Sequence, residues 1–232
     1  MTISGLSTAQ APPPGSEAIA VQIEQAILDH RLQPGTKLTE DELATIYGVG
    51  RTVVRGALQT LSHRNLVETK RNRGAFVAQP TVREAREVFE ARALLEPRTA
   101  HSAAVRARAS DVRNLQRHID REHAALDRGD MGQAVYLSGE FHVALAAIAN
   151  QAIIAEFISS LIARSSLIVA MYWQRRDALC ESHAHHALLD AIGRNDGESA
   201  AELMHSHIVD LLSALDLTTR PEKPRSLRDA LL

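Results

Sequence analysis

The chain has 232 residues, of which 45% are hydrophobic and 23% are charged, and its formal net charge is −2. This length and composition fit a globular protein with one large domain or two small ones. The single cysteine, Cys180, excludes an internal disulfide and a paired-cysteine metal site. Aromatic residues make up only 3% of the chain, so the composition favours helices over a β-sandwich.

Two segments bear on the location of the chain. Residues 1–16 lack a basic start followed by an apolar stretch, and their Pro, Gly and Ser content predicts a flexible leader instead of a secretion signal. The most apolar region, residues 152–173, contains Glu156 and Arg164, which predicts a buried helix and not a membrane span. We therefore expect a cytoplasmic protein without a membrane partner.

Residues 17–79 predict a compact set of elements around two turn signals. Gln33-Pro34-Gly35 ends a first helix, and Gly48-Val49-Gly50 separates two further helices. The predicted elements, in chain order, are a helix over 17–31, a short helix over 39–47, a helix over 51–63, and strands over 66–69 and 75–78. Helices in this order followed by a β-hairpin predict a winged helix-turn-helix domain.

Basic residues gather in this region although the net charge is negative. Residues 51–73 contain six basic residues and one acid, Glu68. In a helix-turn-helix the start of the second helix reaches the base edges, and Arg51 and Arg55 lie there one turn apart. A solvated basic loop is the alternative, which the ordered elements around it disfavour. The candidate DNA contacts are therefore Arg51, Thr52 and Arg55 on the helix, and Lys70, Arg71 and Arg73 on the hairpin tip.

Helical periodicity replaces the strand signals after residue 80. The predicted helices lie over residues 81–107, 110–128, 131–149, 151–175, 177–194 and 197–215. Pro97 is expected to break or kink the first of them after Leu95, and residues 216–232 are expected to form a flexible tail. The predicted fold class is mainly α: a winged helix-turn-helix over 17–79 and an all-α bundle over 81–215.

The N-terminal pattern resembles a known family. The run LQPGTKLTEDELATIYGVGRTVVRGALQTLSHRNLVETKRNRGAFV is similar to the operator-binding domain of the GntR family. The resemblance implies that Arg51 and Arg55 contact the operator together with the wing glycine, Gly74. Gly50, Val53 and Gly56 stand where the family usually has Ser, Pro and Glu, and Asp41 where some relatives have a DNA-contacting arginine. These departures bear on the operator sequence and leave the expected fold intact.

Three histidines stand out in the C-terminal half. His142 lies in SGEFHVALAAIANQ, His185 in HHALLDAI and His207 in AAELMHSHI. Together with Arg92 and Glu96 in RALLE, these segments resemble the FCD effector domain of the FadR-type branch of GntR regulators, over about residues 81–215.

The FCD resemblance implies a divalent metal, Zn, Ni or Mn, held by the three histidines and by a carboxylate four residues before the first. That position is Ser138, a poor ligand. The remaining position would fall to water, to the effector or to Glu140, which points to another side of its helix than His142. The alternative is that the histidines are ordinary polar residues of the bundle. No organic cofactor is expected.

Arg92 has two interpretations. By the resemblance, its guanidinium grips an effector carboxylate through paired hydrogen bonds. Alternatively, it forms a salt bridge to Glu96 four residues later, which contributes a few tenths of a kcal/mol on an exposed helix.

The resemblance implies a ligand-responsive transcriptional regulator, a repressor that binds a pseudo-palindromic double-stranded operator as a homodimer and senses a small carboxylic acid. A metal sensor built on the helical domain stays open as an alternative. A metal-dependent hydrolase is the other, and it is disfavoured because we find no positioned general base, nucleophile–base pair or glycine-rich phosphate loop. We therefore expect no enzymatic activity.

Overall fold

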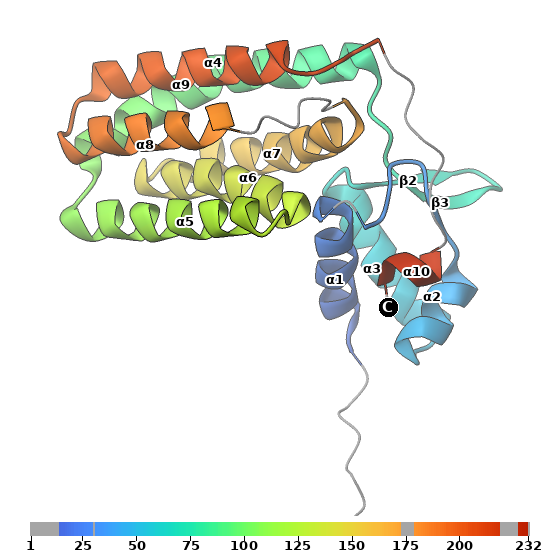
Figure 1. The fold of residues 1–232 in the computed structure, drawn as a ribbon. Helices are drawn as coiled ribbons and strands as arrows, with labels where there is room; N and C mark the ends of the chain where they lie inside the picture. Colours follow the sequence, from blue (N-terminus) through green and yellow to red (C-terminus); the bar gives the residue numbers. More distant parts are fainter. Residues whose placement is uncertain (1–13, 30, 173–178, 219–226, 232) are drawn as a thin grey trace, which may run out of the picture.

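The computed structural model describes residues 14–29, 31–172, 179–218 and 227–231, and the expected leader lies largely outside them. The N-terminal elements lie together on one side of the molecule (Figure 1). They are α1 (Ser16–Leu28), β1 (Lys37–Leu38), α2 (Glu40–Tyr47), α3 (Arg51–His63), β2 (Val67–Lys70) and β3 (Gly74–Val77). This is the predicted winged helix-turn-helix.

The wing is a small antiparallel sheet with the strand order β1-β3-β2. Val67 pairs with Val77, and Lys37 pairs with Phe76. The sequence did not reveal β1, because a strand of two residues is too short to show an alternating pattern.

The recognition helix α3 buries one face and exposes the other. Val54, Ala57, Leu58 and Leu61 are buried, as their spacing predicts. Gly56 faces the start of α1, where a Cβ on residue 56 would lie 2.8 Å from Ser16 Oγ. A side chain at residue 56 would therefore require the Ser16 side chain to move, so a small residue suits this contact.

The C-terminal half is a bundle whose helices run side by side (Figure 1). They are α4 (Val82–Arg106), α5 (Ala109–Asp127), α6 (Met131–Ile148), α7 (Ala152–Tyr172), α8 (Leu179–Gly193) and α9 (Gly197–Ser213). A capping box starts α4: Thr81 Oγ1 accepts from the Glu84 amide at 3.2 Å, and the Thr81 amide donates to Glu84 at 2.8 Å.

Pro97 does not break the first bundle helix, because α4 continues through it over 25 residues. Proline removes one backbone hydrogen bond. Both halves of α4 are buried, with Phe89 before Pro97 and Ala100 and Ala103 after it. Packing of both halves against the bundle outweighs the missing hydrogen bond.

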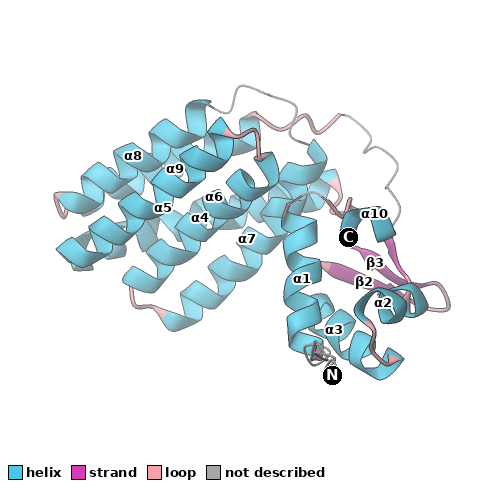
Figure 2. Ribbon diagram, turned by 60° about the horizontal axis from the view of Figure 1, so that its bottom comes forward, coloured by secondary structure: helices cyan, strands magenta, loops and turns pink. Residues whose placement is uncertain are grey.

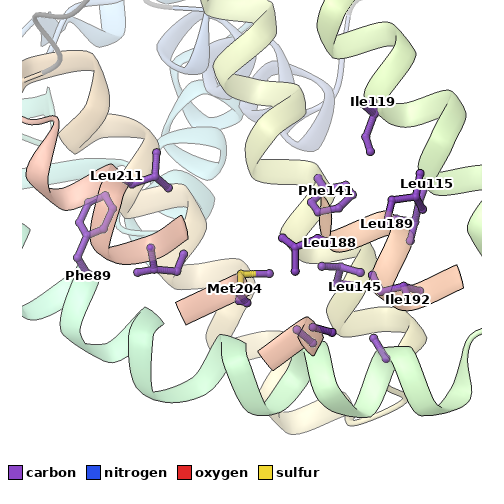
Figure 3. Close-up of a cluster of buried hydrophobic side chains, with 14 of the residues drawn as sticks. Phe89, Leu115, Ile119, Phe141, Leu145, Leu188, Leu189, Ile192, Met204 and Leu211 are labelled. Carbon is purple, nitrogen blue, oxygen red and sulfur yellow. The ribbon is translucent and has the colours of Figure 1, made fainter. Parts of the chain in front are cut away.

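The bundle core lies between α4, α6, α8 and α9. Figure 3 shows Phe141 and Leu145 of α6 close to Leu188 and Ile192 of α8. Phe141 stacks on the His185 ring with centroids 4.2 Å apart. Phe141 therefore anchors two histidines in the apolar core: His142, its neighbour in the chain, and His185, on which it stacks.

Helix α7 is the most apolar element. Its window Ala152–Val169 is long and apolar enough to cross a membrane by length and composition, with a mean hydropathy of 1.7. Helices in the core of water-soluble proteins meet the same criterion. Here α7 packs against α4 and α6 within the bundle. Only 33% of this window is buried, so the prediction of a buried helix holds for one part of α7 and not for its exposed side.

The end of the chain returns to the winged domain as α10 (Leu227–Leu231), beside α2 in Figure 2. Leu227 and Ala230 are buried in the apolar cluster of the winged domain. Arg31 Nη1 donates to the Ala230 carbonyl at 2.9 Å. The expected flexible tail over 216–232 therefore contains a docked helix.

Candidate DNA-binding surface and metal centre

The predicted DNA contacts all lie at the surface of the winged domain. On α3 these residues are Arg51, Thr52 and Arg55, and at the hairpin tip they are Lys70, Arg71, Arg73 and Gly74. A groove of about 240 Å³ runs between α3 and the hairpin, and both Arg55 and Gly74 line it. Gly74 has a φ of +93°, a conformation that favours glycine. The structure thus brings the predicted contacts of α3 and of the wing onto one surface.

Two carboxylates of α2 form ion pairs with the two arginines of α3. Arg51 Nε lies 2.5 Å from Asp41, and Arg55 Nε lies 2.9 Å from Glu40. Both arginine side chains are more than 60% exposed, at 63% and 64%. Exposed ion pairs contribute only about 0–1 kcal/mol, so a phosphate or a base edge can displace these carboxylates at little cost.

The three predicted histidines meet inside the bundle, each from a different helix. His142 of α6, His185 of α8 and His207 of α9 are 2%, 0% and 4% exposed. One nitrogen of each lies within 4.8 Å of the others. The ring centroids are 5.0–5.5 Å apart. We call these three residues the histidine cluster.

Two buried carboxylates support the histidine cluster from outside. His142 Nδ1 lies 2.5 Å from Glu96 Oε2, and His185 Nδ1 lies 3.0 Å from Glu122 Oε2. The Nδ1 atom of each ring thus lies next to a carboxylate, as an ion-pair contact for His142 and as a hydrogen bond for His185. Among the described residues, Nε2 of His185 and of His207 has no hydrogen-bond partner. A carboxylate on the far nitrogen is the usual support of a metal-binding imidazole.

Burial and charge set the protonation of this centre. Burial lowers the pKa of His142, although Glu96 opposes this shift. The pKa of His207 is lowered further, by burial and by the other two histidines. Burial alone would raise the pKa of Glu96, but Arg92 and His142 lower it to about 2. At neutral pH His142 and His207 are therefore neutral imidazoles, the form that binds metal, and Glu96 is ionised.

The histidine cluster fits a divalent ion by its donor set. Neutral, buried and unpartnered imidazole nitrogens suit zinc and similar ions. Ser138 is 9% exposed and lines a small cavity of about 30 Å³ beside His142. Glu140 lines a different cavity, between α1, α6 and α7. No protein carboxylate thus faces the histidine cluster from the position where the family carries one.

Arg92 forms the salt bridge to Glu96 and keeps one free donor, so its interpretation as an effector anchor stays a prediction. It is 3% exposed, and Nε donates to Glu96 at 2.6 Å, so the expected salt bridge exists but is buried. Nη1 donates to Ser165 Oγ at 3.1 Å. Nη2 is buried without a hydrogen-bond partner among the described residues. Arg92 lines the 30 Å³ cavity together with His142 and Ser138, so its free donor belongs to the same site.

Sequence reasoning missed Glu122 and Ser165. Glu122 is 1% exposed on α5 and continues the buried positions of Leu115 and Ile119. A lone acid in the apolar register of a helix was a readable signal for a buried partner. Ser165 had no such signal, since serine is common on every helix face. The neighbouring His183 and His205 are exposed, as expected of residues outside the histidine cluster.

Comparison with known proteins agrees with this arrangement. The model of the gntR family of bacterial regulatory proteins matches residues 16–77, and the FCD domain matches residues 87–210. The chain is similar to the Uxu operon regulator of Haemophilus influenzae, with 29% identity over 75% of this chain and 71% of the relative. It is 23% identical to the transcriptional repressor RspR of Escherichia coli, over 85% of this chain and 87% of the relative.

Solved structures show the same fold. A crystal structure of a GntR regulator from Rhodococcus sp. RHA1 has a TM-score of 0.75 at 25% identity, over 85% of this chain and 95% of that one. McbR/YncC of E. coli has a TM-score of 0.70 at 23% identity, over 85% of this chain and 97% of that one. The curated relatives are transcriptional regulators and not enzymes. The chain therefore belongs to the GntR family of DNA-binding transcriptional regulators, in the FadR-type branch that carries an FCD domain.

Proposed function

We propose that the protein is a repressor that releases or binds its operator in response to a small organic acid. The groove between α3 and the wing carries the DNA-binding part, because it places Arg55 and Gly74 on one exposed surface. Arg51 and Arg55 read bases, while Lys70, Arg71 and Arg73 contact the backbone. RspR and the galactonate operon regulator of E. coli are named repressors, which supports repression over activation. We place the protein in the cytoplasm with its DNA.

We further propose a homodimer on a pseudo-palindromic operator. Leu94 of α4 and Ile153 and Phe157 of α7 are 74%, 72% and 60% exposed, and α4 and α7 pack against each other. Exposed apolar side chains on adjacent helices are typical of a subunit interface. Two copies present two winged domains, as a selective operator site requires.

The effector site, in this proposal, is the histidine cluster with the adjoining 30 Å³ cavity. Nε2 of His142, His185 and His207 would hold Zn, Ni or Mn, and Glu96 and Glu122 would orient the first two rings. A bound divalent ion supplies a positive centre for an acid. The unpartnered Nη2 of Arg92 offers a second anchor for the same carboxylate. Ser138 leaves the family's carboxylate position free for the effector.

The DNA-binding part is tested by fluorescence anisotropy with the promoter of the protein's own gene. We expect sequence-selective binding that weakens steeply as salt rises. Binding that is equally tight to unrelated DNA at physiological salt would contradict the operator proposal. Titrating a metal-stripped sample first with the ion and then with an acid separates the effector proposal from a metal sensor, in which the ion alone changes operator affinity.

The metal part is tested by elemental analysis and by thermal melts with added Zn, Ni or Mn. We expect His207→Ala to lose the bound ion and its stabilisation of the fold. His205→Ala is the matched control, because His205 is exposed on the same helix. Equal metal content in both variants would show that the ion lies elsewhere.

A further inference from the structure

A second cavity lies between the two domains. It measures about 270 Å³ and is lined by α1 of the winged domain and by α6 and α7 of the bundle. At about 30 Å³ per water molecule, its size corresponds to about nine waters. It is much larger than the 30 Å³ cavity beside the histidine cluster. We call it the interdomain cavity.

Direct backbone contact closes one end of the interdomain cavity. A Cβ on Gly132, in the first turn of α6, would lie 2.3 Å from the Asp29 carbonyl oxygen at the end of α1. Leu28, beside Asp29, and Tyr136, one turn after Gly132, both line the cavity. Leu167 of α7 is buried in the apolar cluster of the winged domain. The walls of the cavity are thus fixed by two packing contacts between the domains, one between α1 and α6 and one between α7 and the winged domain.

Most of the cavity wall is apolar. Leu28 comes from α1, Val143 from α6, and Ile162 and Ala163 from α7. Val21 of α1 also lines it and is 50% exposed, a high value for a valine beside a core. An apolar wall of this kind suits the body of a small organic molecule.

Three polar groups of the wall have partners within the protein. Gln25 donates its amide to Asp29 at 2.7 Å, and Ser166 Oγ donates to the Ile162 carbonyl at 3.0 Å. Glu24 is paired with Arg64. In the part of the chain that the structure describes, no hydrogen bond or ion pair engages the half-buried carboxylate of Glu140. Its oxygens are not among the fully buried polar atoms that lack a partner, so this carboxylate is accessible to a ligand from the solvent.

The ionisable side chains that line the interdomain cavity are Glu24, Tyr136 and Glu140, and no Lys, Arg or His is among the residues that line it. Burial raises the pKa of Glu140; His118 opposes this shift, and Glu24 contributes a smaller rise. Burial also raises the pKa of Tyr136, and Glu140 and Glu24 add to this shift. Burial is the main cause of both shifts, so both groups are partly shielded from water. Two lining acids without a lining cation favour a positively charged ligand over an anion.

We propose that the interdomain cavity is a second ligand site, which takes a small organic amine with an apolar body. Its ammonium group pairs with Glu140, and its body packs on Val143, Ile162 and Leu28. The chemistry is opposite to that of the 30 Å³ cavity, where Arg92 and the histidines select an anion. Ser166 lines both cavities, so α7 separates two sites of opposite charge preference. This proposal does not depend on a metal or on the acid effector.

Calorimetric titration of the metal-free full chain tests the site with three probes of matched size. The probes are 2-phenylethylamine, 2-phenylethanol and phenylacetate, which differ in charge. We expect the amine to bind about tenfold more tightly than the alcohol, the usual gain of a charged hydrogen-bonded pair. Glu140→Gln should reduce the amine affinity to that of the alcohol. Ala163→Leu, which fills the cavity, should weaken both.

The matched control is Glu156→Gln, because Glu156 is an exposed acid on α7 that does not line the cavity. It should leave the amine affinity unchanged. Circular dichroism and thermal melts establish that each variant folds. The proposal is overturned if no probe gives a binding signal at millimolar concentration, if amine and alcohol bind equally, or if amine affinity persists in Glu140→Gln.

Discussion

The DNA-binding surface and the histidine cluster both rest on arginine–carboxylate pairs, but the pairs differ in burial. The side chains of Arg55 and Glu40 are 64% and 35% exposed, whereas those of Arg92 and Glu96 are 4% and 2% exposed. In water such a pair breaks at little cost, while in the protein interior an unpaired charge is strongly disfavoured. The same type of ion pair is thus easily broken on the surface of the winged domain, whereas inside the bundle it holds the side chains in fixed positions.

Each kind of pair suits its role. In the proposed complex, Arg51 and Arg55 would leave Asp41 and Glu40 when the operator binds. The histidine cluster requires that ring orientations persist without a ligand, and Glu96 holds both His142 and Arg92 in place.

Breaking the buried pair should have the largest effect. In Glu96→Gln, Arg92 keeps its charge in the interior without a countercharge. We expect the free energy of unfolding at neutral pH to fall by about 3–5 kcal/mol, measured by urea denaturation of metal-free protein. Glu87→Gln, which breaks the exposed pair with Arg83, should cost less than about 1 kcal/mol. Similar losses in both variants would remove the contrast between the domains.

The stability of the fold should also depend on pH through Glu96. The pKa of Glu96 is about 2 in the folded chain, below its ordinary 4.5. A lowered folded pKa means that ionised Glu96 stabilises the fold above pH 4.5, and that this contribution is lost as the pH falls from 4.5 towards 2. Urea denaturation across this range should show a steeper loss in the natural protein than in Glu96→Gln. Parallel losses would contradict the assignment.

Removing a base-reading arginine should have an intermediate effect. We expect Arg55→Ala to weaken binding to the operator by about 1–3 kcal/mol and to relax the preference for one base position. Anisotropy with the operator and with single-base variants measures both. A uniform loss across all DNA sequences would instead show that Arg55 contacts only phosphate.

Removing a wing cation should act on salt dependence. We expect Lys70→Ala to weaken binding to all sequences alike and to lower the slope of log affinity against log salt by about one unit. The same salt series on Arg55→Ala provides the comparison. If the two variants changed specificity and slope identically, the division between base-reading helix and backbone-contacting wing would be wrong.

Removing the acid that pairs with Arg55 should have the smallest effect, and it should tighten operator binding instead of weakening it. Glu40 holds Arg55 in the free protein and repels DNA phosphates. Glu40→Gln should therefore tighten operator binding, by less than about 1 kcal/mol. The double variant Glu40→Gln with Arg55→Ala should lose most of this gain, which a thermodynamic cycle measures. Weaker binding in Glu40→Gln would show that the pair positions Arg55 for DNA.

The sequence predicted the local parts of the molecule better than the distant contacts. Arg51, Arg55 and the wing lie within a short, ordered run, so periodicity and turn residues placed them. The histidine cluster followed only from the resemblance, because its members are 43 and 22 residues apart along the chain. The contact of Gly132 with Asp29 depends on tertiary packing between domains, which no local pattern encodes. Pro97 shows the converse, where packing overrode a strong local signal.

Helix α10 has a consequence for how the two ends of the chain work together. It has five residues, and a free peptide of that length does not hold a helix in water. It docks on the winged domain because the same chain carries it there, at an effective concentration in the millimolar range. An extension or truncation at the C-terminus will therefore reach the DNA-binding half of the protein first, although the nearest domain along the chain is the one that holds the histidines.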